Sequence, residues 1–403
     1  MQVAPVLAAL RRHRLAAMLI AMEIALACAV LCNACFLVAE RLNSMRIDSG
    51  VDEASLALIH VDCDQCNGND VNARLEGALR ALPGVQSVAA VNALPFSDRA
   101  GDNGINLDRE HYVAVPHFYL GGPGAAETLG LRLVAGRKFI PEDFRRSDIW
   151  LSPDTSVWIS RAFAERLWPG QDPLGKEFWS DKFHFTVVGV MDHLARPDPS
   201  GRRGPDASEY AVFAPTAPGG RTLTGVFAVR AAPADLPRVL REARAAAQKA
   251  VPEGVLNLDQ SRMVSELRQR YFHQARVMAS MLTGVIVALL MVTALGIVGL
   301  ASFWVQQRRK QIGVRRAIGA TRLDILYYFQ TENFLIVTGG IAIGMLLAFA
   351  LNIALMRIYE LPRLPLYYLP VGAVLLWVIG QLAVLGPALR AASVPPVVAT
   401  RSV

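Results

Sequence analysis

The spacing of apolar stretches constrains the fold of this 403-residue chain more than any other feature. One apolar stretch lies near residue 1, a long and mostly polar region follows, and three more apolar stretches come after it. A helix of about 20 apolar residues crosses the roughly 30 Å hydrocarbon core of a bilayer. The sequence therefore predicts four transmembrane helices in a 1 + 3 arrangement, at residues 15–39, 277–305, 332–356 and 364–389.

The charges predict how these helices are oriented. Residues 40–276 carry 28 Lys or Arg and 30 Asp or Glu, whereas the rest of the chain carries 13 basic and 4 acidic residues. The basic residues outside 40–276 cluster before the first stretch, after the second and after the fourth, and the positive-inside rule places such clusters in the cytoplasm. The net charge of +7 therefore reflects membrane topology and gives no reason to expect nucleic-acid binding.

The sequence thus predicts a multi-pass protein of the cell inner membrane. We expect a large periplasmic domain at 40–276 and a short periplasmic loop at 357–363, with the N-terminus (1–14), the loop at 306–331 and the C-terminus (390–403) in the cytoplasm. A cleaved signal peptide is the alternative for the first stretch. An apolar segment of about 25 residues is long for such a peptide, and no clear small-x-small site follows, so we favour an uncleaved anchor.

The periplasmic segment has the pattern of a mixed α/β domain, which makes the whole chain an α+β membrane protein. Short apolar runs and stretches of helical periodicity predict two β-α-β units, at 55–91 and 225–258, separated by an inserted lobe. Within this lobe we expect a helix at Trp158–Trp168 and a β-rich run at Phe183–Val190.

Residues 260–276 are polar but keep helical spacing, and they lead directly into the second apolar stretch. A single helix from Ser261 to Val305 would be much longer than a bilayer is thick. We therefore expect a stalk at 260–276, with an ordinary linker as the alternative.

Small residues recur every four positions in two of the apolar stretches. Ala21 and Ala25 belong to such a stripe in the first, and Gly340 and Gly344 to one in the third. Small residues let helices approach closely in lipid, which predicts either a tight bundle or a dimer. Glu23 is the only charged residue well inside a stretch. It is either functional or close enough to the cytoplasmic edge to reach lipid headgroups or a nearby arginine.

The loop between the second and third stretches is strongly patterned. Residues 308–324 read RRKQIGVRRAIGATRLD, and Thr321 with Asp324 fits a capping box that begins a helix. Topology and anionic lipid explain most of the arginines. The apolar-and-glycine part, Ile312–Gly313 and Ala317–Ala320 (which includes Ile318), needs another reason, because small residues there would let a partner surface approach the backbone.

This loop resembles the FtsX-like permeases of ABC systems, in particular the MacB type with an outer core domain. The family signature is similar to R-x-x-E-I-G-I-R-[RK]-A-L-G-A-[TS], and Arg308–Thr321 matches it, with Gln311 where the family usually has Glu. Further resemblances follow in the family's order, at Leu82–Pro95, Leu129–Asp143, Val157–Lys176 and Phe185–Val190, and an FtsX-like permease domain is expected at 277–400.

The resemblance implies a permease subunit of an ABC-type export or mechanotransmission complex. A separate cytoplasmic ABC ATPase would hydrolyse ATP, and the permease would form a homodimer or heterodimer in membrane lipid, with a periplasmic adaptor and an outer-membrane channel as further partners. The alternative is a non-transporting membrane-anchored sensor or an FtsX-type regulator of periplasmic partners. By resemblance, the residues that couple the chain to the ATPase are Ile312, Gly313, Arg315, Arg316, Ala317, Gly319, Ala320 and Thr321.

Two motifs suggest chemistry that the sequence does not support. Gly170–Glu177 almost spells a P-loop, but Glu177 replaces the hydroxyl residue that binds Mg²⁺, and the motif lies in the predicted periplasmic domain. Cys63 and Cys66 form a C-x-x-C that is compatible with a local disulfide, free thiols or a metal site. The sequence contains no recognisable catalytic constellation, so we predict no enzymatic activity, no cofactor and no metal in this chain.

Overall fold

The structure is a computed structural model that describes residues 14–63, 65–98, 101–108, 112–147, 150–199, 208–219, 223–359 and 363–393. The chain divides into two compact units. The outer domain is Ser44–Gln274, and the helical unit combines Met1–Asn43 with Ala275–Val403.

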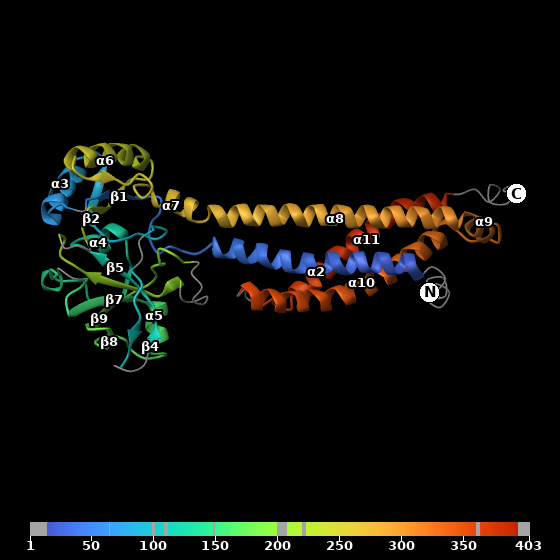
Figure 1. The fold of residues 1–403 in the computed structure, drawn as a ribbon, viewed down its shortest axis with the longest axis horizontal. Helices are drawn as coiled ribbons and strands as arrows, with labels where there is room; N and C mark the ends of the chain where they lie inside the picture. Colours follow the sequence, from blue (N-terminus) through green and yellow to red (C-terminus); the bar gives the residue numbers. More distant parts are fainter. Residues whose placement is uncertain are drawn as a thin grey trace. The chain divides into compact units, whose positions relative to one another are not determined.

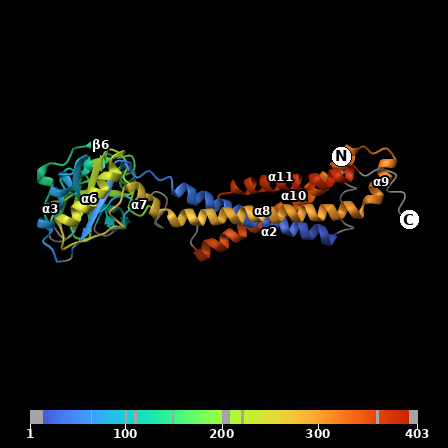
Figure 2. The same ribbon diagram turned by 90° about the horizontal axis from the view of Figure 1, so that it is seen from above.

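In the described part of the helical unit there are four long helices and one short helix (Figures 1 and 2). They are α2 (Arg14–Ser44), α8 (His273–Gln307), α9 (Arg309–Ala317), α10 (Arg322–Tyr359) and α11 (Tyr368–Ala392). The four long helices are long and apolar enough to cross a membrane. The predicted 1 + 3 arrangement is therefore confirmed among the described residues, although α10 begins well before residue 332.

The core of the helical unit lies around α2. Ile24, Cys28 and Leu31 of this helix are at most 1% exposed and pack with apolar residues of α8, α10 and α11. By contrast, α8 leaves large apolar side chains such as Met281 and Leu295 exposed by 67% and 70%. Exposed apolar side chains of this kind are typical of a helix that faces lipid.

One part of the outer domain is a four-stranded sheet covered by two helices. Its strand order is β12-β1-β11-β2, and every neighbouring pair is antiparallel. Because β11 lies between β1 and β2, the two β-α-β units interlock in one sheet. The elements are β1 (Leu56–Asp62), α3 (Gly68–Arg80), β2 (Val85–Ala90), β11 (Val226–Ala231), α6 (Leu236–Ala250) and β12 (Val255–Leu256).

Helical periodicity explains why α3 and α6 cover this sheet. Val71, Leu75 and Leu79 recur every four residues in α3, so they share one face, and all three are fully buried. On α6, Val239, Ala243 and Ala247 form the equivalent buried stripe. Both stripes belong to the same hydrophobic core as alternate residues of β1 and β11.

The inserted lobe contains an eight-stranded mixed sheet. The order is β4-β3-β8-β9-β7-β10-β5, with β6 paired to β9. Neighbours are parallel in β7–β9 and β10–β5, and antiparallel in β10–β7. Its strands are β3 (Ile105–Asn106), β4 (Tyr112–Ala114), β5 (His117–Gly121), β6 (Leu133–Gly136), β7 (Asp154–Ser160), β8 (Glu177–Ser180), β9 (Phe183–Met191) and β10 (Ala211–Pro215). Its short helices are α4 (Ala125–Leu129), η1 (Pro141–Asp143) and α5 (Arg161–Leu167).

The prediction of a helix at Trp158–Trp168 is wrong for its first residues. Trp158 and Ile159 belong to β7, which pairs with β9 on one side and β10 on the other. Both residues are at most 2% exposed, because the two faces of this central strand are covered. The helix α5 begins only after Ser160, whose hydroxyl accepts a hydrogen bond from the Phe163 amide at 3.4 Å.

The predicted continuous helix from Ser261 to Val305 is also wrong. The structure has α7 (Val264–Tyr271) and then α8, with Phe272 between them outside both helices. The Phe96 ring contacts the rings of both Tyr271 and Phe272, at centroid distances of 5.8 Å and 5.7 Å. Adjacent residues of a regular helix point about 100° apart, so the chain leaves helical geometry to pack both rings against one partner.

Candidate functional site

The candidate site is the turn that joins α8 to α10 through α9. The sharp ends of this turn have local causes. Gly319 has a φ of +107°, a conformation that favours glycine, and it lets the chain reverse after α9. At the start of α10, the Asp324 amide donates to the Thr321 hydroxyl at 3.2 Å, and the Thr321 amide donates to the Asp324 carboxylate at 2.9 Å. The capping box predicted from the sequence is therefore confirmed.

A buried ion pair fixes this turn to α10. The Arg308 guanidinium, at the junction of α8 and α9, donates to both oxygens of Glu332 at 3.0 Å and 2.7 Å. Arg308 is 8% exposed and Glu332 is 1% exposed, and the guanidinium also lies over the Trp304 ring at 5.8 Å. A buried charge without its partner is costly, so this pair holds the two helices in one arrangement.

The eight predicted coupling residues fall into buried and accessible groups. The side chain of Ile312 and the backbone at Gly313 are buried against the helical unit. In this structure they support α9 from its buried side, and their role in coupling stays a prediction. Arg315, Ala317, Gly319 and Thr321 are exposed, and Arg316 and Ala320 are half-buried.

Three large apolar side chains are exposed at this turn, and the sequence analysis included only Ile318 among them. Val314, Ile318 and Leu323 are 49%, 82% and 60% exposed. Val314 and Ile318 are four residues apart, so they lie on one side of α9 and the residue that follows it. The i, i+4 spacing of Val314 and Ile318 is the feature of the sequence that could have indicated an apolar face. The basic residues around this pair made the apolar pattern difficult to recognise. We call Val314, Ala317, Ile318 and Leu323 the coupling surface.

A small cavity of about 160 Å³ lies beside the coupling surface. The Arg315 guanidinium lies over the Tyr328 ring at 4.8 Å on its rim, a cation–π contact between α9 and α10. The cavity is lined by Arg308, Gln311, Ile312, Arg315, Ala320, Asp324, Ile325, Tyr328 and Phe329.

The predicted packing residues of α2 and α10 meet within this chain. A Cβ added to Gly340 would lie 2.8 Å from the Ala21 carbonyl oxygen, and one added to Gly344 would lie 2.8 Å from the Ala25 carbonyl oxygen. The Asn33 amide of α2 also donates to the Ala348 carbonyl of α10 at 3.0 Å. The small residues therefore join two helices of one bundle.

Glu23 lies against the backbone of α8. A Cβ added to Gly296 would be 2.5 Å from Oε1 of Glu23, so the glycine leaves the space that the carboxylate occupies. The structure thus places Glu23 at a contact between α2 and α8.

One arginine connects the two segments by which the chain enters and leaves the outer domain. Arg268 of α7 donates to the Glu53 carboxylate at 2.6 Å and to the carbonyls of Met45 and Ile47 at 2.8 Å and 2.6 Å. Its guanidinium also lies 5.1 Å from the centre of the Phe96 ring. The residues that follow α2 and those that precede α8 are thereby held together inside the domain.

The other sequence candidates occupy structural positions in the outer domain. Cys63 and Cys66 are joined as a disulfide, with their Cα atoms 5.6 Å apart. The near P-loop at Gly170–Glu177 leads into strand β8, whereas a P-loop leads into a helix. Among the described residues, no group of His, Cys, Asp and Glu side chains is arranged to hold a metal ion.

His117 is the most deeply buried histidine of the domain among the described residues. It is 1% exposed, and its Nδ1 lies 3.0 Å from Asp102, which also pairs with Arg196. Burial lowers the pKa of His117 below its ordinary value, although the Asp102 carboxylate acts in the opposite direction.

Two family models match the chain. The FtsX-like permease C-terminal model matches residues 283–396, which include α9 and α10. The MacB-like periplasmic core domain model matches residues 16–246, more than half of the chain.

Curated relatives share low identity over long segments. The macrolide export ATP-binding/permease protein MacB of Bdellovibrio bacteriovorus is 24% identical over 56% of this chain and 34% of that protein. The pyoverdine export ATP-binding/permease protein PvdT of Pseudomonas aeruginosa is 26% identical over 68% and 39%. The uncharacterized ABC transporter permease YvrN of Bacillus subtilis is 24% identical over 72% and 71%. The chain thus spans about a third of the length of the MacB proteins it matches.

Two solved structures are similar to about half of the chain. The periplasmic region of MacB from Actinobacillus actinomycetemcomitans is 13% identical and covers 57% of this chain and 97% of its own, with a TM-score of 0.35. The extracellular domain of the noncanonic ABC-type transporter YknZ from Gram-positive bacteria is 17% identical and covers 50% and 99%, with a TM-score of 0.34. On the two family models, the chain belongs to the FtsX-like ABC permeases that carry a MacB-like periplasmic core domain.

Proposed function

We propose that this protein is the transmembrane subunit of an ABC-type complex for export or mechanotransmission. In this proposal a separate cytoplasmic ATPase docks on the coupling surface, and its ATP-driven closure moves the periplasmic domain. The observation that carries the proposal is the exposure of Val314, Ile318 and Leu323 at the turn between two candidate spans. Apolar side chains grouped on a surface are typical of a protein interface.

The surroundings of the coupling surface suit this role. Arg315 is exposed beside it and would orient a partner that carries acidic residues. The buried pair between Arg308 and Glu332 ties the turn to α10, and Arg308 directly follows α8. A displacement of α9 would therefore move α8 and α10 with it rather than bend a flexible loop.

We further propose that the coupling surface and both termini lie in the cytoplasm. The outer domain, residues 44–274, would then lie in the periplasm. The excess of basic residues outside the outer domain supports this orientation. Helix α8 has 35 residues, about 52 Å at 1.5 Å per residue, which is longer than the hydrocarbon core of a bilayer. Helix α8 is joined through Phe272 to α7, and Arg268 of α7 binds the residues that follow α2. Motion of α2 or α8 would therefore reach the domain.

The assembly proposed here is a dimer of permeases in lipid with an adaptor and an outer-membrane channel. Two relatives are named for macrolide and pyoverdine export, which supports export as the direction of transport. No substrate is assigned to this chain. The alternative function is a membrane-anchored sensor or regulator that has no ATPase partner. The following test separates this alternative from the proposal.

The test is whether vanadate-sensitive ATPase activity co-purifies with the full-length tagged chain from its native membranes. Ile318→Glu places a charge on the most exposed apolar residue, and Ala317→Trp adds bulk without the strain that any replacement of Gly319 would cause. Each change should lower the co-purified activity at least about tenfold, as for an interface hot spot. Leu258→Glu, at a 58% exposed leucine of the outer domain, should leave it unchanged. Equal activity in all four proteins would exclude docking here, and no activity in any would favour the sensor.

A further inference from the structure

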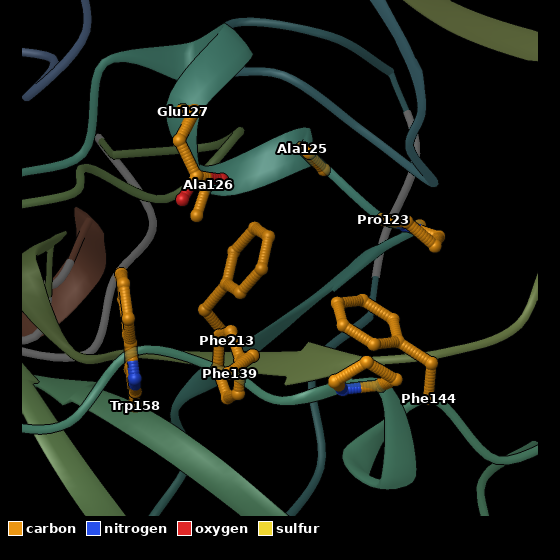
Figure 3. Close-up of a pocket in the computed structure, with 11 residues that line it drawn as sticks. Pro123, Ala125, Ala126, Glu127, Phe139, Phe144, Trp158 and Phe213 are labelled. Carbon is orange, nitrogen blue, oxygen red and sulfur yellow. The ribbon is translucent and has the colours of Figure 1, made fainter.

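One cavity of the outer domain, lined by several aromatic side chains, has no part in the proposed coupling. Figure 3 shows it between α4 with the turn before it and the side chains of Phe139, Phe144, Trp158 and Phe213. Its volume is about 370 Å³, which lies within the range of small-molecule sites. It is lined by Gly122, Pro123, Gly124, Ala125, Ala126, Glu127, Phe139, Pro141, Phe144, Trp158 and Phe213.

The cavity exists because one wall is made of very small residues. The sequence from Gly121 to Ala126 is GGPGAA, so this wall has no side chain long enough to reach across. The opposite wall is aromatic, with the Phe139 ring stacked on Trp158 at 4.6 Å and 17° and on Phe213 at 6.0 Å and 30°. Packing within the domain therefore leaves a space bordered by flat rings.

The aromatic wall is rigid. The Trp158 indole donates from Nε1 to the Arg137 carbonyl at 3.0 Å, which fixes its orientation and satisfies its polar atom. Gly189 lies directly behind the indole, since a Cβ there would come within 2.5 Å of Trp158. A preformed wall of this kind binds a flat ligand without first ordering its own side chains.

The charged side chain that lines the cavity is negative. Among the described residues that line it, Glu127 is the only charged one, and Figure 3 shows its carboxylate on the side that faces the aromatic rings. Lys138 lies 3.6 Å from this carboxylate, but both side chains are more than half exposed. Such a surface pair contributes little free energy, so a bound cation can replace the lysine.

We propose that this cavity binds a small planar aromatic cation. Its ring would lie against the half-buried rings of Phe139 and Phe144, and its positive charge would lie beside Glu127. Both walls favour this class, because aromatic faces attract flat rings and cations, whereas an anion would be repelled by the carboxylate. The proposal does not depend on docking of an ATPase, because the cavity lies entirely within the outer domain.

The test compares three indole probes that differ mainly in charge. Full-length protein in lipid nanodiscs is dialysed to equilibrium against tryptamine (cation), indole (neutral) or indole-3-propionate (anion), without nucleotide and with empty nanodiscs as the blank. We expect affinity to fall in that order, with tryptamine at least about tenfold tighter than indole-3-propionate. Glu127→Gln should bring tryptamine to within about twofold of indole.

Filling the cavity should abolish binding of all three probes. Ala126→Phe places a ring in the space, whereas Ala245→Phe adds the same ring on the exposed face of α6 and should change nothing. Glu76→Gln, which removes another exposed carboxylate paired with a basic residue, is the matched control for Glu127→Gln.

Three results would overturn the proposal. They are no binding above the blank, tightest binding of the anion, and tryptamine binding that survives Ala126→Phe. The order of affinity of the three probes for the unaltered protein tests the preference for a cation by itself. The proposal can therefore be contradicted even if a variant misfolds. Because nucleotide is absent, failure here leaves ATPase docking as it stands.

Discussion

The Arg308 and Glu332 side chains are charged groups that folding has removed from water. Desolvation of two such ions is expensive, and it is offset here by two hydrogen bonds between them and by the Trp304 ring. The pair therefore stabilises one particular arrangement of the turn more than it stabilises the protein as a whole. Its partners come from the end of α8 and the middle of α10, so it determines how the coupling surface is held.

Removing one member of this pair should be more harmful than removing both. Arg308→Met or Glu332→Gln leaves one buried charge without its partner and should lower the free energy of unfolding by about 3–5 kcal/mol. The double change Arg308→Met with Glu332→Leu should recover most of this loss. Denaturant unfolding of the purified protein in micelles measures these values, with Lys310→Met, at an exposed lysine, as the control. Additive losses in the double variant would show that the two side chains do not interact.

His117 predicts how the outer domain responds to acid. Because burial holds its pKa below the value in the unfolded chain, the unfolded state binds the proton first as the pH falls below about 6.5. Stability should therefore be complete above that pH and should decline below it. His117→Gln should flatten this decline, while contributions from the other histidines remain in both proteins. Thermal unfolding at pH 7.5 and pH 5.5 checks this, and an equal slope in the two proteins would contradict it.

At the scale of elements, glycines of α10 have different surroundings on different faces. Gly344 lies against α2, where a new Cβ would come within 2.5 Å of the Cβ of Cys28, whereas Gly339 has nothing within 4 Å of that position. The close approach of α2 and α10 therefore depends on the face that carries Gly340 and Gly344.

This difference predicts opposite effects for the same substitution within one helix. Gly344→Ala should destabilise the helical unit by about 1–3 kcal/mol, because α2 must move or strain. Gly339→Ala should be neutral or stabilising by up to about 1 kcal/mol, because alanine favours the helix. Unfolding of the two variants in micelles measures the contrast. Equal effects would mean that α2 and α10 do not pack through Gly344.

The sequence predicted the long elements well and the short boundaries poorly. Apolar length alone located the four spans, and the stripe Val71, Leu75, Leu79 indicated α3. Trp158 was assigned to a helix because a central strand covered on both faces has no alternation, so its apolar run looks the same as a buried helix. The break at Phe272 depends on its contact with Phe96, which is distant in sequence and therefore absent from any local pattern.

The sequence indicated this turn as the candidate site but not the burial of its residues. The motif at 308–321 singled out the segment, and Thr321 with Asp324 predicted the cap that the structure has. Which side of α9 faces the helical unit was not predictable, since it depends on how α8 and α10 pack. That packing buries Ile312 and Gly313 and leaves Ile318 exposed. The pair of Arg308 with Glu332 joins residues 24 positions apart and had no local signal.

For the whole molecule, we propose that one chain serves two compartments. The helical unit supplies four candidate spans and the coupling surface, and the outer domain supplies an α/β body with a binding cavity of its own. Arg268 of α7 holds the residues that follow α2 inside that body, through Glu53 and the carbonyls of Met45 and Ile47. This organisation suits a protein that is driven by ATP hydrolysis in a partner and responds on the other face of the membrane.

The most direct test is the side of the membrane on which each unit is accessible. Single cysteines are introduced by Ala317→Cys on the coupling surface and by Ala245→Cys on α6, both at exposed positions, and are treated with a membrane-impermeant maleimide before and after permeabilisation. The account predicts that Cys at 245 reacts in cells whose outer membrane alone is opened, and that Cys at 317 reacts only when the inner membrane is also opened. Reaction of both positions from the same side would contradict it.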